Sequence, residues 1–174
     1  ADTRSGNPAT VEMVKNVMEP INKMDGDSLP VSAFEKYVDG QFEQGASAYE
    51  KRGVAVTVPE WDAEKCIQCN QCAYVCPHAT IRPFALTADE AAKAPEGFKS
   101  KKMTGKGCED YVFTISVSPL DCMGCGVCAG VCPAPGKALT MVPQESQLAQ
   151  QAVFGYCVDN IDKKPGMMAE TTVK

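Results

Sequence analysis

The sequence has neither a long apolar run nor an excess of positive charge. No stretch approaches the roughly 18 uninterrupted apolar residues of a membrane span, so we expect no membrane partner. The first ten residues, 1–10, are polar and lack the apolar core of a secretory signal. Lys and Arg total 17 against 22 Asp and Glu, a formal net charge of −5. That balance argues against binding to the phosphate backbone of a nucleic acid.

Cysteine, in contrast, is abundant, at 10 of 174 residues. Eight of the ten fall into two runs, residues 66–77 and 122–133, which both read C-x2-C-x2-C-x3-C-P. Bacterial ferredoxins hold a pair of [4Fe–4S] clusters with this pattern. The second run follows the first by 56 positions. The doubled motif therefore predicts two [4Fe–4S] clusters within an internal repeat.

The spacing also predicts which cysteines share a cluster. Three cysteines at i, i+3 and i+6 of a tight loop direct their thiolates at three corners of one cluster, whereas the fourth belongs to the other cluster. For cluster 1 we expect the ligands Cys66, Cys69, Cys72 and Cys132, and for cluster 2 Cys122, Cys125, Cys128 and Cys76. This crossing requires the clusters to lie close together, which suits electron hopping between them.

Other readings of the cysteines fit less well. Disulfides within runs of eleven residues would be badly strained and would need an oxidising compartment. Zinc sites use separated C-x2-C pairs rather than this triple spacing. Residues 124–129 match G-x-G-x-x-A, but the intervening positions are cysteine ligands, so we reject a dinucleotide site. We expect the glycines there to let backbone N–H groups approach the cluster sulfurs.

Each run is flanked by β-rich residues, which indicates strand, cluster loop, helical turn and strand, twice over. The expected strands are 54–58, 81–84, 112–117 and 138–142. The predicted fold class is α+β, a bacterial two-cluster ferredoxin-like core with a pseudo-two-fold repeat. Its expected extent is 54–143 with an insertion at about 85–110, between an N-terminal arm, 1–53, and a C-terminal arm, 144–174.

Local signals predict several elements outside the repeat. Asn7-Pro8 is typical of a helix start, and apolar residues continue at helical spacing to Ile21. Residues 25–53 read as ordered coil. A capping box at Thr87–Glu90 predicts a short helix ending near Ala94. The other expectations are an exposed loop over 97–107 and a helix from Glu145 to Phe154 that Gly155 stops.

Some residues keep two interpretations. Four lysines of the insertion form either a solvated loop or a docking patch for an acidic redox carrier: Lys99, Lys101, Lys102 and Lys106. His78, the only histidine, is either a solvated loop residue or a group that couples a proton to cluster reduction. Cys108 and Cys157 are too few to hold a third cluster, so we interpret them as buried or loop thiols rather than metal ligands.

Beyond the cysteine runs, several segments resemble the two-cluster segment of pyruvate:ferredoxin oxidoreductase. These are residues 29–34, 48–53, 66–83, 94–99 and 117–139. The resemblance covers nearly the whole chain. It implies a large, thiamine-diphosphate-dependent enzyme that converts pyruvate and coenzyme A to acetyl-CoA and carbon dioxide. Electrons then leave one at a time, through a proximal cluster and the two clusters of this domain, to an external ferredoxin or flavodoxin.

The resemblance places thiamine diphosphate, Mg and coenzyme A in the rest of the parent enzyme, so we expect the chain alone not to be catalytic. Its expected partners are the other domains or subunits of that enzyme and the external carrier. The chain does not begin with Met, which leaves a segment and a natural subunit equally open. The alternatives are a free-standing two-cluster ferredoxin and a scaffold with structural clusters. We expect a reducing, cytoplasmic location, because exposed clusters are sensitive to oxygen.

Overall fold

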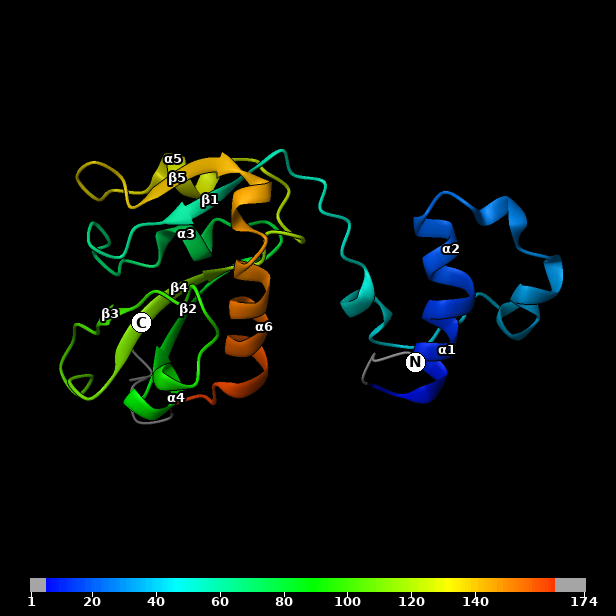
Figure 1. The fold of residues 1–174 in the computed structure, drawn as a ribbon, viewed down its shortest axis with the longest axis horizontal. Helices are drawn as coiled ribbons and strands as arrows, with labels where there is room; N and C mark the ends of the chain where they lie inside the picture. Colours follow the sequence, from blue (N-terminus) through cyan, green and yellow to red (C-terminus); the bar gives the residue numbers. More distant parts are fainter. Residues whose placement is uncertain (1–5, 165–174) are drawn as a thin grey trace. The chain divides into compact units, whose positions relative to one another are not determined.

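The computed structural model describes residues 6–164 and divides into two compact units, Ala1–Arg52 and Gly53–Lys174 (Figure 1). The first unit is helical, and the second combines strands and helices. Among the described residues, no helix has the length and apolar character needed to cross a membrane.

The first unit begins with a continuous helical stretch, α1 (Pro8–Met13), a π-helical turn (Val14–Met18) and α2 (Glu19–Asn22). The Asn7 side chain caps α1 by accepting a hydrogen bond from the N–H of Ala9 at 2.9 Å, as the sequence predicts. The π turn ends two residues before Pro20, which has no N–H to donate. The helix passes this proline because the N–H of Glu19 bonds to the carbonyl of Val14, one residue further back than in an α-helix.

The same unit has a small core of its own. Met13, Val14 and Val17 are buried, and Phe34 and Tyr49 are among the side chains packed against them. The residues expected to be coil form 3-10 turns at Gly26–Ser28, Val31–Tyr37 and Ala46–Tyr49. Side chains of the last two turns pack against the buried residues of the helix, and this packing accounts for ordered turns where the sequence predicts coil.

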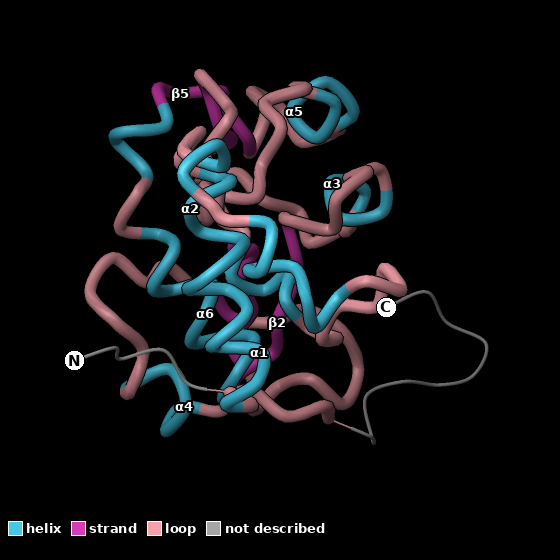
Figure 2. Tube along the Cα trace, turned by 90° about the vertical axis from the view of Figure 1, so that its right-hand side faces the viewer, coloured by secondary structure: helices cyan, strands magenta, loops and turns pink. Residues whose placement is uncertain are grey.

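The second unit contains two small antiparallel sheets. Strand β1 (Thr57–Trp61) pairs with β5 (Leu139–Pro143), and β4 (Val112–Val117) lies between β2 (Ile81–Leu86) and β3 (Lys101–Lys102). Short helices α3 (Gln71–Tyr74) and α5 (Val127–Val131) follow the two cysteine loops (Figure 2). This mixture confirms the α+β class and agrees with a ferredoxin-like domain.

The core of the second unit joins the two sheets. It consists of Trp61, Ile81, Phe113, Ile115, Val117, Cys128 and Leu139. The rings of Trp61 and Phe113 meet edge to face, with centroids 6.2 Å apart. Cys66, Cys72 and Cys76 pack against this core, so the first cysteine loop rests on side chains that the two sheets contribute.

The first expected strand lies later than predicted, at Thr57–Trp61 instead of 54–58. The reason is its partner: Thr57 lies opposite Pro143, where β5 ends, so residues 54–56 have no strand to pair with. The insertion also differs, because the expected exposed loop over 97–107 contains β3. Lys101 and Lys102 pair there with Phe113 and Val112 of β4.

Helix α4 (Ala88–Ala92) begins with the predicted capping box between Thr87 and Glu90. Helix α6 (Gln150–Asn160) corrects the other helix prediction, because it begins later than Glu145 and continues through Gly155. It runs beside β4 (Figure 1), where Val153, Phe154 and Cys157 are buried. A helical glycine costs about 1 kcal/mol, which the burial of these side chains outweighs.

Candidate iron–sulfur centres

Each cysteine run forms a tight loop with two left-handed backbone positions. Gln68 and Asn70 have φ of 60° and 61° in the first loop, and Gly124 and Gly126 have φ of 70° and 73° in the second. The two pairs occupy equivalent places in the repeat. Glycine adopts this conformation without strain, whereas other residues lose about 1–3 kcal/mol. The first loop therefore needs additional support.

These left-handed positions direct N–H groups at the sulfurs of the first cysteine in each loop. The N–H of Gln68 donates to Cys66 Sγ at 3.4 Å, and the N–H of Gly124 donates to Cys122 Sγ at 3.4 Å. For Gly124, the predicted approach of a glycine N–H to a sulfur is confirmed. Such bonds favour negative charge on sulfur, although burial outweighs this effect at Cys122 and raises its pKa on balance.

The support for the first loop comes from the Gln68 side chain, which is 3% exposed. Its amide nitrogen donates to the carbonyl of Lys102 at 2.8 Å, and its oxygen accepts from the N–H and hydroxyl of Thr104 at 3.0 and 3.1 Å. The insertion therefore holds the first loop in place. Sequence reasoning missed this role, although the signal was present: a glutamine stands where the second loop has glycine.

The eight cysteines of the runs lie around two cavities in the second unit. One cavity, of about 330 Å³ including space open to solvent, is lined by Cys66, Cys69, Cys72 and Cys132. The other, of about 350 Å³, is lined by Cys76, Cys122, Cys125 and Cys128. The structure thus brings the cysteines together in the same two groups of four that the spacing predicts.

The crossing between the groups has a simple structural cause. Cys76 comes two residues after α3, and Cys132 is the C-cap residue of α5. These two helices lie next to each other (Figure 2). Cys76 is thereby carried to the cavity of the second loop, and Cys132 to that of the first.

The donor set of each cavity fits an iron–sulfur cluster better than a single ion. Within residues 6–164, no three His, Cys, Asp or Glu side chains are grouped so that they could hold one metal ion. A tetrahedral zinc site draws its sulfurs to about 2.3 Å from one centre. Four cysteines around a cavity instead match the thiolate set of a [4Fe–4S] cluster, which supplies reversible one-electron transfer when bound.

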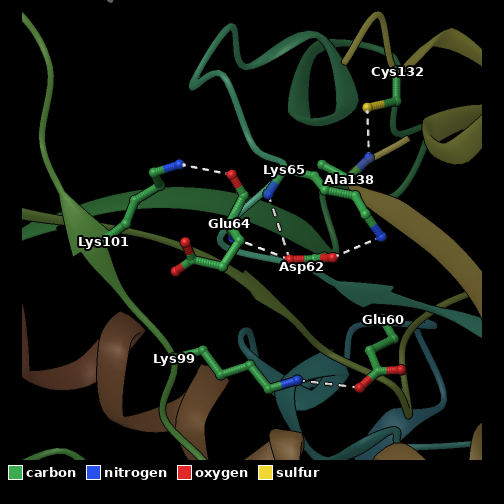
Figure 3. A network of polar contacts seen from close by, with 8 residues as sticks. All are labelled: Glu60, Asp62, Glu64, Lys65, Lys99, Lys101, Cys132 and Ala138. Atoms are coloured by element: carbon green, nitrogen blue, oxygen red, sulfur yellow. Dashed lines mark hydrogen bonds and ion pairs between the residues drawn. The ribbon is translucent and has the colours of Figure 1, made fainter. Parts of the chain in front are cut away.

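The fourth cysteine of each run is held differently. Cys76 Sγ lies 3.4 Å from both the N–H and the hydroxyl oxygen of the buried Thr80. Cys132 Sγ accepts the N–H of Ala138 at 3.3 Å (Figure 3). Sequence reasoning singled out neither Thr80 nor Ala138, because they bond to sulfur from four and six positions away.

Comparison with known proteins agrees with this geometry. Residues 65–136 match the family described as a 4Fe-4S dicluster domain, and residues 3–55 match a family (EKR) described as a domain of unknown function. The chain is 49% identical over 161 residues to a pyruvate-flavodoxin oxidoreductase of Enterobacter agglomerans. It is 54% identical over 146 residues to a pyruvate:ferredoxin oxidoreductase of Moorella thermoacetica. Over most of its length the chain is therefore homologous to a segment of pyruvate:ferredoxin and pyruvate-flavodoxin oxidoreductases.

In these relatives the chain corresponds to a short segment. The two matches cover 92% and 83% of the chain but only 14% and 12% of the relatives. A mitochondrial pyruvate dehydrogenase [NADP(+)] of Euglena gracilis is 44% identical over 80% of the chain, which is 8% of that relative. The dicluster match means that residues 65–136 bind two [4Fe–4S] clusters.

Burial affects the protonation of cysteines in both cavities. It raises the pKa of Cys72 to about 12 and that of Cys128 to about 11. Burial also acts to raise the pKa of Cys76, but the hydrogen bonds from the Thr80 hydroxyl and N–H lower it on balance. Cys72 and Cys128 would therefore keep their protons at neutral pH without a metal, and binding of a cluster would require their release.

The four lysines of the predicted docking patch do not form one free surface. The Lys99 ammonium pairs with Glu60 at 3.1 Å, and the Lys101 ammonium donates to the carbonyls of Cys66 and Glu64 at 2.8 and 3.4 Å (Figure 3). Lys102 and Lys106 are exposed. Two of the four lysines therefore contact residues 60–66, which lie before and within the first cysteine loop.

The remaining candidate residues lie apart from the ligand groups or at their edge. Cys108 and Cys157 are buried and line neither cavity. Burial raises the pKa of Cys157 to about 11, so it packs as a neutral thiol. His78 is exposed and lies at the rim of the cavity of Cys76.

The second loop provides a test of its glycines. A Cβ at Gly124 would lie 3.0 Å from the Thr57 carbonyl oxygen, whereas a Cβ at Gly126 would meet nothing within 4 Å. Both positions have φ near +70°. We expect Gly126→Ala to cost about 1 kcal/mol from strain alone. Gly124→Ala adds a backbone clash and should cost about 2–4 kcal/mol.

Urea denaturation and iron content of the two variants measure this difference. The Gly124 variant should also lose iron, because the Gly124 N–H that bonds to Cys122 Sγ has to move. Equal losses of stability in the two variants would contradict the role assigned to the Thr57 contact.

Proposed function

We propose that the chain carries single electrons through its two [4Fe–4S] clusters, as the ferredoxin-like module of a thiamine-diphosphate-dependent pyruvate:ferredoxin oxidoreductase. The electrons come from the 2-oxoacid oxidation site and leave to an external ferredoxin or flavodoxin. The observation that carries this proposal is the pair of adjacent cavities, each lined by four cysteines, three from one run and one from the other. Exchanged ligands keep two clusters within hopping distance.

The proposed ligands follow from the same arrangement. Cluster 1 would be held by Cys66, Cys69, Cys72 and Cys132, and cluster 2 by Cys122, Cys125, Cys128 and Cys76. The N–H groups of Gln68, Gly124, Ala138 and Thr80 would neutralise part of the charge on the sulfurs. The matching order of strand, loop, helix and strand in both halves supports a pseudo-two-fold repeat within 54–143.

The rest of the proposal concerns the surroundings of the chain. Thiamine diphosphate, Mg and coenzyme A would be bound by other parts of the parent enzyme, and the segments 1–53 and 144–174 would serve as contacts to them. Lys102 and Lys106 are the lysines available for docking an acidic carrier. A reducing compartment such as the cytoplasm would keep the thiolate ligands from oxidising.

The test compares two half-reactions in the full-length polypeptide that contains this chain. We expect Cys69→Ala and Cys125→Ala each to abolish reduction of flavodoxin or ferredoxin, because each substitution removes a ligand of one cluster. Release of carbon dioxide from pyruvate in a single turnover should persist. Cys108→Ala is the matched control, since this buried cysteine lines neither cavity. Unchanged reduction of the carrier in both ligand variants would refute the proposal.

A further inference from the structure

Two lysine ammonium groups are bound to the backbone of cluster 1 ligands. Lys101 Nζ donates to the carbonyl of Cys66 at 2.8 Å (Figure 3 shows its second bond, to the carbonyl of Glu64). Lys137 Nζ donates to the carbonyl of Cys132 at 2.7 Å and to that of Gly130 at 2.8 Å. The two lysines come from different parts of the chain, the insertion and the turn before β5. Both place a positive charge beside the same cavity.

These two charges are not neutralised by acidic side chains. Lys99 pairs with Glu60 at 3.1 Å, and Lys65 pairs with Asp62 at 2.9 Å. Within residues 6–164, by contrast, neither Lys101 nor Lys137 forms an ion pair with a carboxylate, and backbone carbonyl groups fix both ammonium groups. A fixed, unpaired cation acts on a nearby charge more strongly than one that is paired or free to move.

The surroundings of cluster 2 differ. Within the described part of the chain, no lysine or arginine side chain donates to the carbonyl groups of its four cysteines. The nearest equivalent is Arg82, whose Nε donates to the carbonyl of Ala79 at 2.7 Å, three residues beyond Cys76. Its guanidinium lies over the ring of Phe154, 5.6 Å from the centroid. The buried hydroxyl of Thr80 beside Cys76 Sγ adds a dipole but no net charge.

We propose that Lys101 and Lys137 hold the reduction potential of cluster 1 above that of cluster 2, so that electrons pass from cluster 2 to cluster 1. The inference rests on the proposed electron-transfer function. Reduction adds one negative charge to a cluster, and the two fixed ammonium groups stabilise that charge. In this step cluster 2 is oxidised by one electron and cluster 1 is reduced by one. No bond breaks and no proton moves. The insertion thereby has an electrostatic role at cluster 1.

The test is a potentiometric titration of the clusters, followed by EPR, in the full-length polypeptide. Lys101→Gln and Lys137→Gln remove one charge each while keeping a polar side chain. Each should lower the equilibrium constant for reduction of the higher-potential cluster of this domain by about three- to tenfold. A tenfold change is about 59 mV for one electron. The double variant should show a larger shift, and the lower-potential cluster should move less.

Three controls isolate the charge. Lys101→Arg and Lys137→Arg keep the cation and should leave the potentials close to those of the unaltered protein. Lys99→Gln removes a charge from the same segment, but one that is paired with Glu60, so it should shift neither cluster. Iron and acid-labile sulfide are measured for every variant.

The possible outcomes separate clearly. A larger shift of the lower-potential cluster than of the higher-potential one, equal shifts of both, or no shift of either would overturn the inference. Loss of iron from every glutamine variant, with retention in the arginine variants, would also overturn it, since the lysines would then act structurally. Potentials ordered as proposed in a protein that reduces no external carrier would refute the proposed function but not this inference.

Discussion

Combining Cys69→Ala with Cys132→Ala is expected to remove no more iron than either substitution alone. The two cysteines stand in different runs but line the same cavity, so the first substitution already removes the cluster that the second would affect. The expected loss is about four irons per chain for each single variant and for the double variant. Combining Cys69→Ala with Cys76→Ala, two cysteines of one run, should remove about eight, because they line different cavities.

The measurement is iron and acid-labile sulfide per chain after anaerobic purification, with EPR of the reduced protein. Ligation within each run would give the opposite result, with about eight irons lost in the first double variant and about four in the second. Cys108→Ala accounts for any general effect of removing a buried thiol, and it should lose none.

Replacing Trp61 by Ala is expected to destabilise the second unit by about 3–5 kcal/mol, as large aromatic-to-alanine changes in cores do. Trp61 is 6% exposed, packs edge to face on Phe113 and lines the cavity of Cys66. Its loss would leave a void next to the cysteines and open them to water. Small domains are stable by only about 5–15 kcal/mol, so this cost is a large part of the total stability. Iron should be lost from cluster 1 first, because Trp61 lines the cavity of Cys66 and not that of Cys76.

Trp61→Phe is the matched control. The indole Nε1 is buried and has no hydrogen-bond partner within residues 6–164. Phenylalanine therefore removes no bond and keeps most of the aromatic contact, so the expected cost is below that of the alanine variant by 2 kcal/mol or more. Urea denaturation followed by circular dichroism measures both, because the chain has no other tryptophan for fluorescence. Equal costs would contradict the packing role.

The cluster chemistry could be predicted because it depends on spacing along the chain. C-x2-C-x2-C-x3-C-P confines three sulfurs to one loop whatever surrounds it, and the repetition of the motif predicted the crossed groups that now line the two cavities. The helix caps at Asn7 and Thr87 were predictable for the same reason, since each bond joins residues two or three positions apart.

The errors concerned partners that lie far away in the sequence. Lys99 and Lys101 looked like members of a free loop, yet they contact Glu60 and Cys66 across more than thirty residues. The strand expected at 54–58 was displaced by the end of its partner, and Gly155 did not stop a helix that is buried against β4. In each case a tertiary contact outweighed the local signal, which for Gly155 amounts to about 1 kcal/mol.

The sequence by itself determined the α+β class and the two-cluster chemistry, because eight cysteines at fixed spacing leave few other uses. The relation to pyruvate:ferredoxin oxidoreductases came from the resemblance of further segments outside the cysteine runs. Only the tertiary structure decided how the first loop is held and which charges face each cluster. Gln68 can occupy a left-handed position because Lys102 and Thr104 satisfy its buried amide. Lys101 and Lys137 lie beside the cavity of Cys66 and Cys132 because β3 and the turn before β5 bring their ammonium groups to the carbonyls of these two cysteines. Electrostatic and hydrogen-bond energies depend on distance in space, which the order of residues does not specify.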